Sequence, residues 1–257
     1  MNRFSGRTVI VTGAASGIGL ATSRRFAQEG ASVFLADIDE SGAMLAAQNL
    51  RDQGLLAKAI PLDVTDESRW AHVISEAVAW TGQVDVLVNN AGVSLIGSVE
   101  ETSLAAWRRT LAVNLDGVFL GTRAAISAMK EKGGAIVNVS SIEGIVGDPI
   151  LAAYNASKGG VRIFSKSAAL YCAKQGYGVR INSIHPGFVM TPMVANTVEA
   201  MTPQARGEFE ERFKASIPMA RLAQPEEISG AIAFLASEDA SYMTGSELVV
   251  DGGFTAH

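Results

Sequence analysis

The side chains in this chain best suited to chemistry are a tyrosine and a lysine four residues apart, Tyr154 and Lys158. Residues four apart on a helix share one face, so the phenol and the ammonium would be neighbours. A nearby cation favours the phenolate and lowers the pKa of a phenol, which makes such a pair a proton-transfer device. The plainer interpretation, two ordinary residues on a helix surface, stays open until the rest of the chain is considered.

The elements that must position this pair alternate along the chain. Hydrophobic runs of strand length are separated by segments with a helical period, which predicts parallel βαβ units. We therefore expect one α/β domain over residues 1–257, a Rossmann-type doubly wound parallel sheet of about seven strands with helices on both faces. The expected strands are 8–12, 32–36, 57–61, 84–89, 135–139, 179–184 and 247–250. The expected helices are 19–29, 42–52, 68–80, 104–130, 153–174 and 225–235.

Composition argues against several classes of function. The net charge of -5 offers no basic surface for nucleic acid, and no apolar run is long enough for a membrane span. One cysteine rules out an intrachain disulfide, and three histidines without metal-ligand spacing predict no metal site. The first residues form a short strand and a glycine loop, not a signal peptide, so we expect a cytoplasmic protein.

A glycine-rich loop, TGAASGIG (residues 12–19), joins the first expected strand to the first helix. Glycines permit a tight turn there and let the backbone approach a pyrophosphate, which the free N–H groups of the helix start stabilise. Its position between a strand and a helix favours dinucleotide binding over a plain turn. The expected contacts are Gly13, Ser16, Gly17, Ile18 and Gly19.

The preference between the two nicotinamide dinucleotides depends on Asp37, at the end of the second expected strand. A carboxylate there accepts hydrogen bonds from the ribose hydroxyls and repels a 2′-phosphate. No arginine or lysine stands in the glycine loop, and Ile38 follows Asp37. We therefore expect NAD as the cofactor.

Further motifs follow in order: Asp63-Val64, NNAG (residues 89–92), Asn114, Ser141, YNASK (154–158), HPGFVMT (185–191) and GSELVVDGG (245–253). Together with the glycine loop, they resemble the short-chain dehydrogenase/reductase family over essentially the whole chain. The resemblance implies that Tyr154 is the catalytic acid/base and that Lys158 lowers its pKa and binds the nicotinamide ribose. It implies that Ser141, rather than Ser140, binds the substrate oxygen, and that the Asn114 backbone holds a proton-relay water. It also implies cofactor contacts from Asp63, Val64, Asn90, Ala91, Gly92, Pro186, Gly187, Val189 and Thr191.

Within that family, residues 99–125 and 140–170 resemble the R-specific secondary alcohol dehydrogenases of lactic acid bacteria and the bacterial cyclohexanol and cyclopentanol dehydrogenases. Residues 174–187 resemble bacterial 3β/17β-hydroxysteroid dehydrogenase. These enzymes interconvert secondary alcohols and ketones, so the resemblance implies a small-molecule substrate. They are also homotetramers, so it implies the same assembly for this protein. Some bind a structural magnesium ion near the C-terminus, a site that the Ala256-His257 end of this chain does not favour. The lactobacillar enzymes prefer NADP and lack the acid found at Asp37.

The substrate pocket should lie beside Ser141 and Tyr154, under a lid at about residues 191–218. Its expected wall is mostly apolar and has no arginine or lysine, which suits an uncharged ketone or alcohol of some bulk. The expected wall residues are Val93, Leu95, Glu143, Leu151, Phe188, Met190 and Val194. For Leu151 and Val194, plain core packing is an equal alternative.

Two rival functions stay open. A 3-oxoacyl-carrier-protein reductase would have the same motifs, although Asp37 and the acidic charge balance argue against it. A non-catalytic NAD-binding protein would have the glycine loop but usually lacks the tyrosine or the lysine of the pair. Both Tyr154 and Lys158 are present in this chain. A sugar-nucleotide epimerase would need a larger substrate domain than 257 residues provide.

Overall fold

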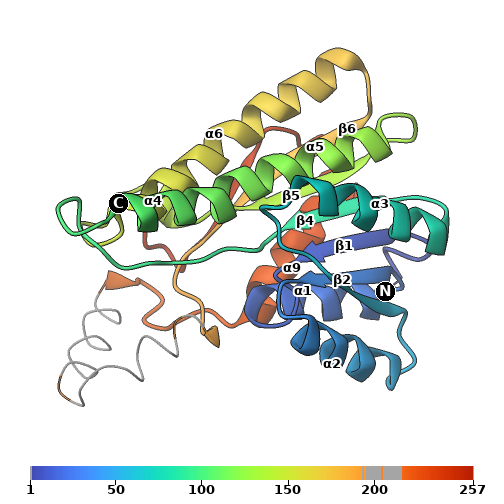
Figure 1. Cartoon of the computed structure of the whole chain (residues 1–257), viewed down its shortest axis with the longest axis horizontal. Coiled ribbons are helices and arrows are strands. Elements are labelled where there is room, and N and C mark those ends of the chain that lie inside the picture. The colour runs from blue at the N-terminus through green and yellow to red at the C-terminus, as the bar shows by residue number, and fades with distance from the viewer. Residues whose placement is uncertain (1, 193, 195–203, 205–215, 257) are drawn as a thin grey trace.

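The fold is a seven-stranded parallel sheet between two layers of helices (Figure 1). A computed structural model describes residues 2–192, 194, 204 and 216–256. The strand order is β3-β2-β1-β4-β5-β6-β7, which confirms the predicted doubly wound α/β sheet. The strands are β1 (Thr8–Thr12), β2 (Ser32–Asp37), β3 (Ala57–Pro61), β4 (Val86–Asn89), β5 (Gly134–Val139), β6 (Val179–Pro186) and β7 (Glu247–Val250).

Each face of the sheet has its own hydrophobic core, because the strands are buried on both sides. Helices α1 (Gly17–Gln28), α2 (Glu40–Arg51) and α9 (Pro225–Ala236) cover one face. Helices α3 (Glu67–Thr81), α5 (Gly117–Met129) and α6 (Ala152–Gln175) cover the other, as Figure 1 shows. Within the described residues, no helix is both long and apolar enough to cross a membrane.

Local sequence signals set the helix ends. The Asp66 side chain accepts a hydrogen bond from the Ser68 N–H and so caps the start of α3. At the other end of α3, Gly82 adopts φ +87°, the left-handed conformation that commonly ends a helix. Gly176 ends α6 in the same way, at φ +69°. The long helix that supplies Tyr154 and Lys158 therefore has a defined stop.

The prediction of one regular helix over residues 104–130 is wrong. Helix α4 (Leu104–Leu111) passes into a π-helical turn (Ala112–Asp116) before α5 begins. A π-turn inserts one extra residue into the helical path and weakens the regular hydrogen bonding, which is why such turns concentrate at functional sites. Hydrophobic periodicity continues across the turn, so the sequence pattern gives no sign of it.

The sheet reverses its strand order between β1 and β4, and open parallel sheets bind ligands at the carboxyl ends of the strands beside such a reversal. The predicted lid at residues 191–218 lies mostly outside the described residues. The described residues of this segment are 191, 192, 194, 204 and 216–218.

Candidate active site

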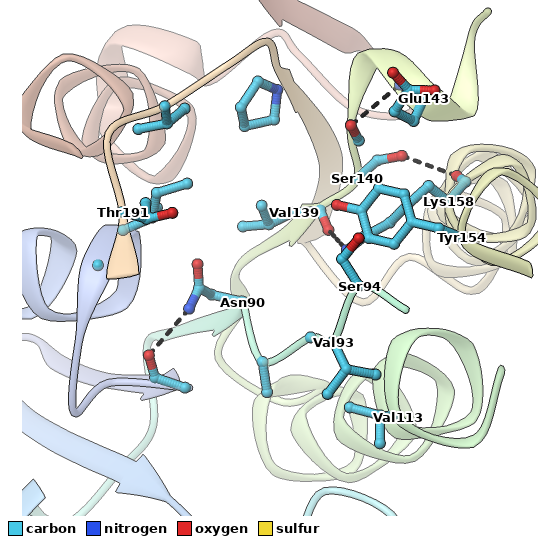
Figure 2. A pocket seen from close by; sticks show the side chains of 18 of the residues that line it. Asn90, Val93, Ser94, Val113, Val139, Ser140, Glu143, Tyr154, Lys158 and Thr191 are labelled. Carbon is cyan, nitrogen blue, oxygen red and sulfur yellow. Dashed lines mark hydrogen bonds between the residues drawn. The ribbon is translucent and has the colours of Figure 1, made fainter. Parts of the chain in front are cut away.

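A cavity of about 790 Å³ runs along the carboxyl ends of the strands. Residues that follow or end six different strands line it, and Figure 2 shows Tyr154 and Lys158 entering it from α6 beside Val139 at the end of β5. These strand-end residues include Gly13, Asp37, Leu62, Asn90, Ser140 and Pro186. One cavity therefore joins the glycine loop to the tyrosine and lysine pair.

The glycine loop is packed so closely that side chains would not fit. Gly13 adopts φ +63°, and a Cβ there would lie 2.9 Å from the Ala91 Cα. A Cβ on Gly19 would lie 2.0 Å from the Gly13 carbonyl oxygen. The Asn90 side chain bonds the Thr12 carbonyl at 2.9 Å and so ties the NNAG segment to this loop. Because its glycines have no side chains, the backbone of the loop can lie close to a bound diphosphate.

The start of α1 is suited to an anion. Its N-cap, Ser16, makes no side-chain capping hydrogen bond, and the first turn of the helix has no acidic residue. Ser16, Gly17 and Ile18 all line the cavity. A helix N-terminus with free N–H groups attracts phosphate. These residues therefore fit the pyrophosphate of a dinucleotide.

Asp37 is held in place by two main-chain N–H groups. One carboxylate oxygen accepts from Ala15 at 2.8 Å and the other accepts from Asp39 at 2.9 Å. The carboxylate thus bridges the end of β2 and the glycine loop, and it lines the cavity beside Ile38. This is where the ribose of a bound adenosine would meet a negative charge.

The two residues of the proton-transfer pair share one face of α6, as their spacing predicts. The Lys158 Nζ lies 5.6 Å from the centre of the Tyr154 ring and donates to the Val139 carbonyl at 2.9 Å. Lys158 is buried, while Tyr154 is half-buried at the cavity wall. The pair is therefore part of a site, not two residues of an open helix surface.

Of the two serines after β5, only Ser141 is available to a ligand. The Ser140 hydroxyl donates to the main-chain carbonyl of Lys158 at 2.8 Å. The Ser141 hydroxyl accepts from the Glu143 N–H at 3.1 Å and is hydrogen-bonded to the Tyr154 side chain. Ser141 and Tyr154 thus present two hydroxyl groups to the same point of the cavity, an arrangement that can hold one substrate oxygen.

The electrostatics of the pair differ from the expectation of a lowered phenol pKa. Burial raises the pKa of Tyr154 to about 12, against the effect of the Ser141 hydrogen bond, and the Glu143 charge adds to the rise. Burial lowers the pKa of Lys158 to about 8. In the protein alone the pKa of the phenol is raised, because removing the phenolate from water disfavours it. Both shifts favour the uncharged forms of the two groups.

Asn114 lies in the π-helical turn and does not line the cavity. Its side chain accepts from the Val93 N–H at 2.8 Å and donates to the Val93 carbonyl at 2.9 Å, which fixes one cavity wall. A Cβ on Gly92 would lie 3.3 Å from the Asn114 Oδ1 and 3.6 Å from the Lys158 Nζ. The absence of a side chain at Gly92 therefore lets Asn114 and Lys158 approach one another.

The cavity brings together most of the residues expected from the sequence. Those that line it are Gly13, Ser16, Gly17, Ile18, Asp37, Ile38, Asp63, Val64, Asn90, Ala91, Gly92, Val93, Ser141, Glu143, Leu151, Tyr154, Lys158, Pro186, Gly187, Phe188, Val189, Thr191 and Val194. Gly19, Leu95 and Met190 do not line it. The Met190 side chain is exposed.

Several lining residues were not expected, among them Ile96, Arg109 and Leu222. Arg109 reaches the cavity from α4 and adds a positive charge that the expected wall residues lack. Val113, four residues later, also lines the cavity. Leu222 comes from a segment without any periodic pattern.

Comparison with known proteins agrees with this geometry. The sequence profile of the family described as enoyl-(acyl carrier protein) reductase matches residues 13–255. The chain is 44% identical to cyclopentanol dehydrogenase of Comamonas testosteroni, over 100% of both chains. It belongs to the short-chain dehydrogenase/reductase family. The resemblance read from the motifs is thereby confirmed.

Other members of the short-chain dehydrogenase/reductase family are as similar. The NADP-dependent (R)-specific alcohol dehydrogenase of Lentilactobacillus kefiri is 43% identical, over 99% of each chain. The 3-alpha-(or 20-beta)-hydroxysteroid dehydrogenase of Mycobacterium tuberculosis is 43% identical, over 99% of this chain and 91% of its own. The crystal structure of gox2181 superposes with a TM-score of 0.93 at 34% identity, over 99% of this chain and 98% of its own. These likenesses support an oxidoreductase and confirm the fold.

Proposed function

We propose that this protein transfers a hydride between NAD(H) and a secondary alcohol or ketone of alicyclic, aryl-alkyl or steroid-like form. The observation that carries the proposal is the meeting of Tyr154, Lys158 and Ser141 at one wall of a cavity that also reaches Asp37. The relatives named as alcohol, cyclopentanol and hydroxysteroid dehydrogenases support the same class of substrate. When bound, the nicotinamide supplies the carbon that accepts or gives the hydride.

In this proposal the Ser141 and Tyr154 hydroxyls hold the substrate oxygen. For alcohol oxidation, the Tyr154 oxygen removes the hydroxyl proton, and for ketone reduction it returns one. Lys158 takes up or supplies that proton beyond Tyr154. The π-helical turn at Asn114 supports this path, because such turns are common at functional sites. Asn114 thus serves the relay and does not touch the substrate.

We propose NAD rather than NADP on the geometry of Asp37. A 2′-phosphate would be repelled by the Asp37 carboxylate. The Ala15 N–H is not free to bind the phosphate, because it already donates to that carboxylate at 2.8 Å. The relative from Lentilactobacillus kefiri is named as NADP-dependent, so overall likeness does not decide the matter. The local contact of Asp37 supports NAD.

The cavity beside Tyr154 supports an uncharged substrate of some bulk. Apolar side chains from four segments line it, which favours hydrocarbon surface around a single polar centre. These side chains are Val93, Ile96, Ile150, Leu151, Phe188 and Leu222. The buried carboxylate of Glu143 disfavours an anionic group nearby.

The proposal is tested by assaying the purified protein with cyclohexanol, cyclopentanol, 1-phenylethanol and a hydroxysteroid, each with NAD and with NADP. We expect turnover of at least one of them, with the higher kcat/KM for NAD. A higher kcat/KM for NADP would overturn the cofactor assignment. Turnover of a 3-oxoacyl thioester alone would favour the carrier-protein reductase, an alternative that the name of the matching family keeps in view.

We also propose a cytoplasmic homotetramer. Exposed apolar side chains lie on the outer faces of α5 and α6, and helices with such faces commonly pack against a second copy. These side chains are Phe119, Ile163, Leu170 and Tyr171. The buried, reduced Cys172 and the nicotinamide cofactor agree with a cytoplasmic location. Sedimentation equilibrium at several concentrations tests the assembly, and a monomer at all of them would overturn it.

A further inference from the structure

The pairing of β5 with β6 stops just before Ser141. The last main-chain bond runs from the Ser140 N–H to the Ile184 carbonyl at 2.8 Å. In a parallel ladder the next donor would be the N–H two residues beyond Ile184. That residue is Pro186, which has no N–H. The ladder therefore ends without a rung to the Ser140 carbonyl, directly before Ser141.

The side chain of His185 supplies a donor one residue further along, at the Ser141 carbonyl. Its Nδ1 lies 3.0 Å from the Ser141 carbonyl oxygen, and the residue is fully buried. The same carbonyl accepts from the Gly144 N–H at 3.0 Å. Two donors thus fix the plane of the peptide that follows Ser141, and with it the direction in which the Ser141 side chain leaves the backbone.

The hydrogen-bond partners of the two ring nitrogens determine which tautomer of the His185 imidazole is present. A carbonyl oxygen only accepts, so Nδ1 must carry the proton of a neutral ring and Nε2 must accept. The Ser183 hydroxyl lies 2.9 Å from Nε2 and can donate to it. Burial lowers the pKa of His185, which favours the neutral ring. The hydrogen bond to the Ser141 carbonyl and the charge of Glu247 oppose this shift, while Arg162 and Lys158 add to it. Ser183 thereby selects the Nδ1–H tautomer.

We propose that His185 is a positioning residue for Ser141, and that Ser183 sets its tautomer. The inference rests on the proposed function, since the position of Ser141 affects catalysis only if that serine binds the substrate oxygen. His185 touches neither substrate nor cofactor and acts through the Ser141 backbone. A histidine that merely satisfied the core would stabilise the fold without any special effect on the step in which Ser141 takes part.

The kinetic test compares His185→Phe, His185→Asn and Ser183→Ala with the wild type, using cyclohexanol and NAD. We expect His185→Phe to lower kcat about tenfold, the worth of one hydrogen bond, with the Kd for NADH unchanged. His185→Asn should recover most of that loss, because its side-chain amide can take the place of Nδ1–H. The kcat of Ser183→Ala should lie between those of His185→Phe and His185→Asn. Equal kcat in all four proteins would overturn the proposal.

A second background separates positioning from general damage. In a Ser141→Ala protein, His185→Phe should cause no further loss of kcat, because the group that it positions is gone. A further tenfold loss there would show a structural effect and overturn the proposal. His72, exposed on α3, offers the matched control. His72→Asn should leave kcat unchanged in both backgrounds.

The tautomer is measured directly by ¹⁵N NMR of the histidine rings, which number three in this chain. His72→Asn and His185→Asn assign the signals. We expect a protonated Nδ1 and an unprotonated Nε2 for His185, and a mixture of tautomers in Ser183→Ala. A protonated Nε2 in the wild type would overturn the inference even if the enzyme turns over alcohols. Failure of the wild type with every alcohol would instead overturn the proposed function, and the tautomer would still be measured.

Discussion

The Asn155 side-chain amide donates to both the main-chain carbonyl and the carboxylate of Glu143, at 2.7 and 2.8 Å. It also donates to the Val146 carbonyl at 3.0 Å and accepts from the Asp148 N–H at 3.2 Å. One side chain from the first turns of α6 therefore holds the whole loop that follows Ser141. The same contacts keep the Glu143 charge next to Tyr154.

Replacing that charge should move the pH dependence of the reaction. Glu143 raises the pKa of Tyr154, so Glu143→Gln should lower it. Alcohol oxidation requires the phenolate, and its rate rises as the phenol loses its proton. The rising limb of kcat against pH should therefore move to lower pH in Glu143→Gln. The exposed Glu131→Gln is the control, and a shift to higher pH, or none, would contradict the prediction.

Removing the phenol should remove the acid/base group. Tyr154→Phe should lower kcat by roughly 10³-fold, in the range that general acid–base catalysis contributes. The Kd for NADH, measured by fluorescence titration, should change little, since the glycine loop and Asp37 are untouched. Tyr242→Phe, fully exposed, should behave as the wild type. Turnover of Tyr154→Phe within tenfold of the wild type would show that another group transfers the proton.

Asp37→Ser should change the cofactor. The substitution removes the charge that a 2′-phosphate would meet and frees the Ala15 N–H to donate. We expect kcat/KM for NADP to rise at least about tenfold while that for NAD falls. Asp39→Ser is the matched control, because Asp39 caps α2 outside the cavity and serine can also cap a helix. An unchanged ratio of the two cofactors in Asp37→Ser would contradict the role of the carboxylate.

Glu247 at the start of β7 should contribute to stability through Arg162 and Lys166 on α6, which it contacts at 2.9 and 2.7 Å. Burial opposes ionisation, but the hydrogen bonds from these two cations lower the pKa of Glu247 from 4.5 to about 2. A lowered carboxyl pKa stabilises the fold above its unfolded value and loses that effect as the pH falls toward 2.

Glu247→Gln should therefore lower the free energy of unfolding by about 1–2 kcal/mol at pH 7. The difference from the wild type should shrink below pH 4.5. Denaturant unfolding at several pH values measures it. Glu238→Gln removes an exposed ion pair with Arg7 and serves as control, with an expected change near zero. A difference that stays constant with pH would show that the ion pairs are not its cause.

The sequence predicted the strands closely, because buried parallel strands are short apolar runs between turn residues, as in Thr8–Thr12 and Glu247–Val250. It also predicted where Asp37 and Ser141 lie, since residues that end parallel strands meet at one edge of the sheet. The predicted strand over 84–89 begins only at Val86, where pairing with β1 starts.

The remaining errors have physical causes. Leu95 and Ile96 are neighbours in an irregular segment, where no period shows which side chain turns inward, and only Ile96 lines the cavity. The raised pKa of Tyr154 depends on burial, which a spacing of four residues does not report. Arg109 was missed because it lies on α4 and not at the end of a strand, where open parallel sheets place most of their ligand contacts.

The π-helical turn at Ala112–Asp116 makes the chain between Leu104 and Met129 longer by one residue than an unbroken α-helix over the same path. Winding the same residues as an unbroken α-helix would make the hydrogen bonding more regular. It would also rotate every later side chain of α5 by about 100°, turning Gly121 away from Trp70 and Asn89, which leave no space for a Cβ at that position. The locally weaker hydrogen bonding is thus what keeps two helical segments in phase with two different neighbours.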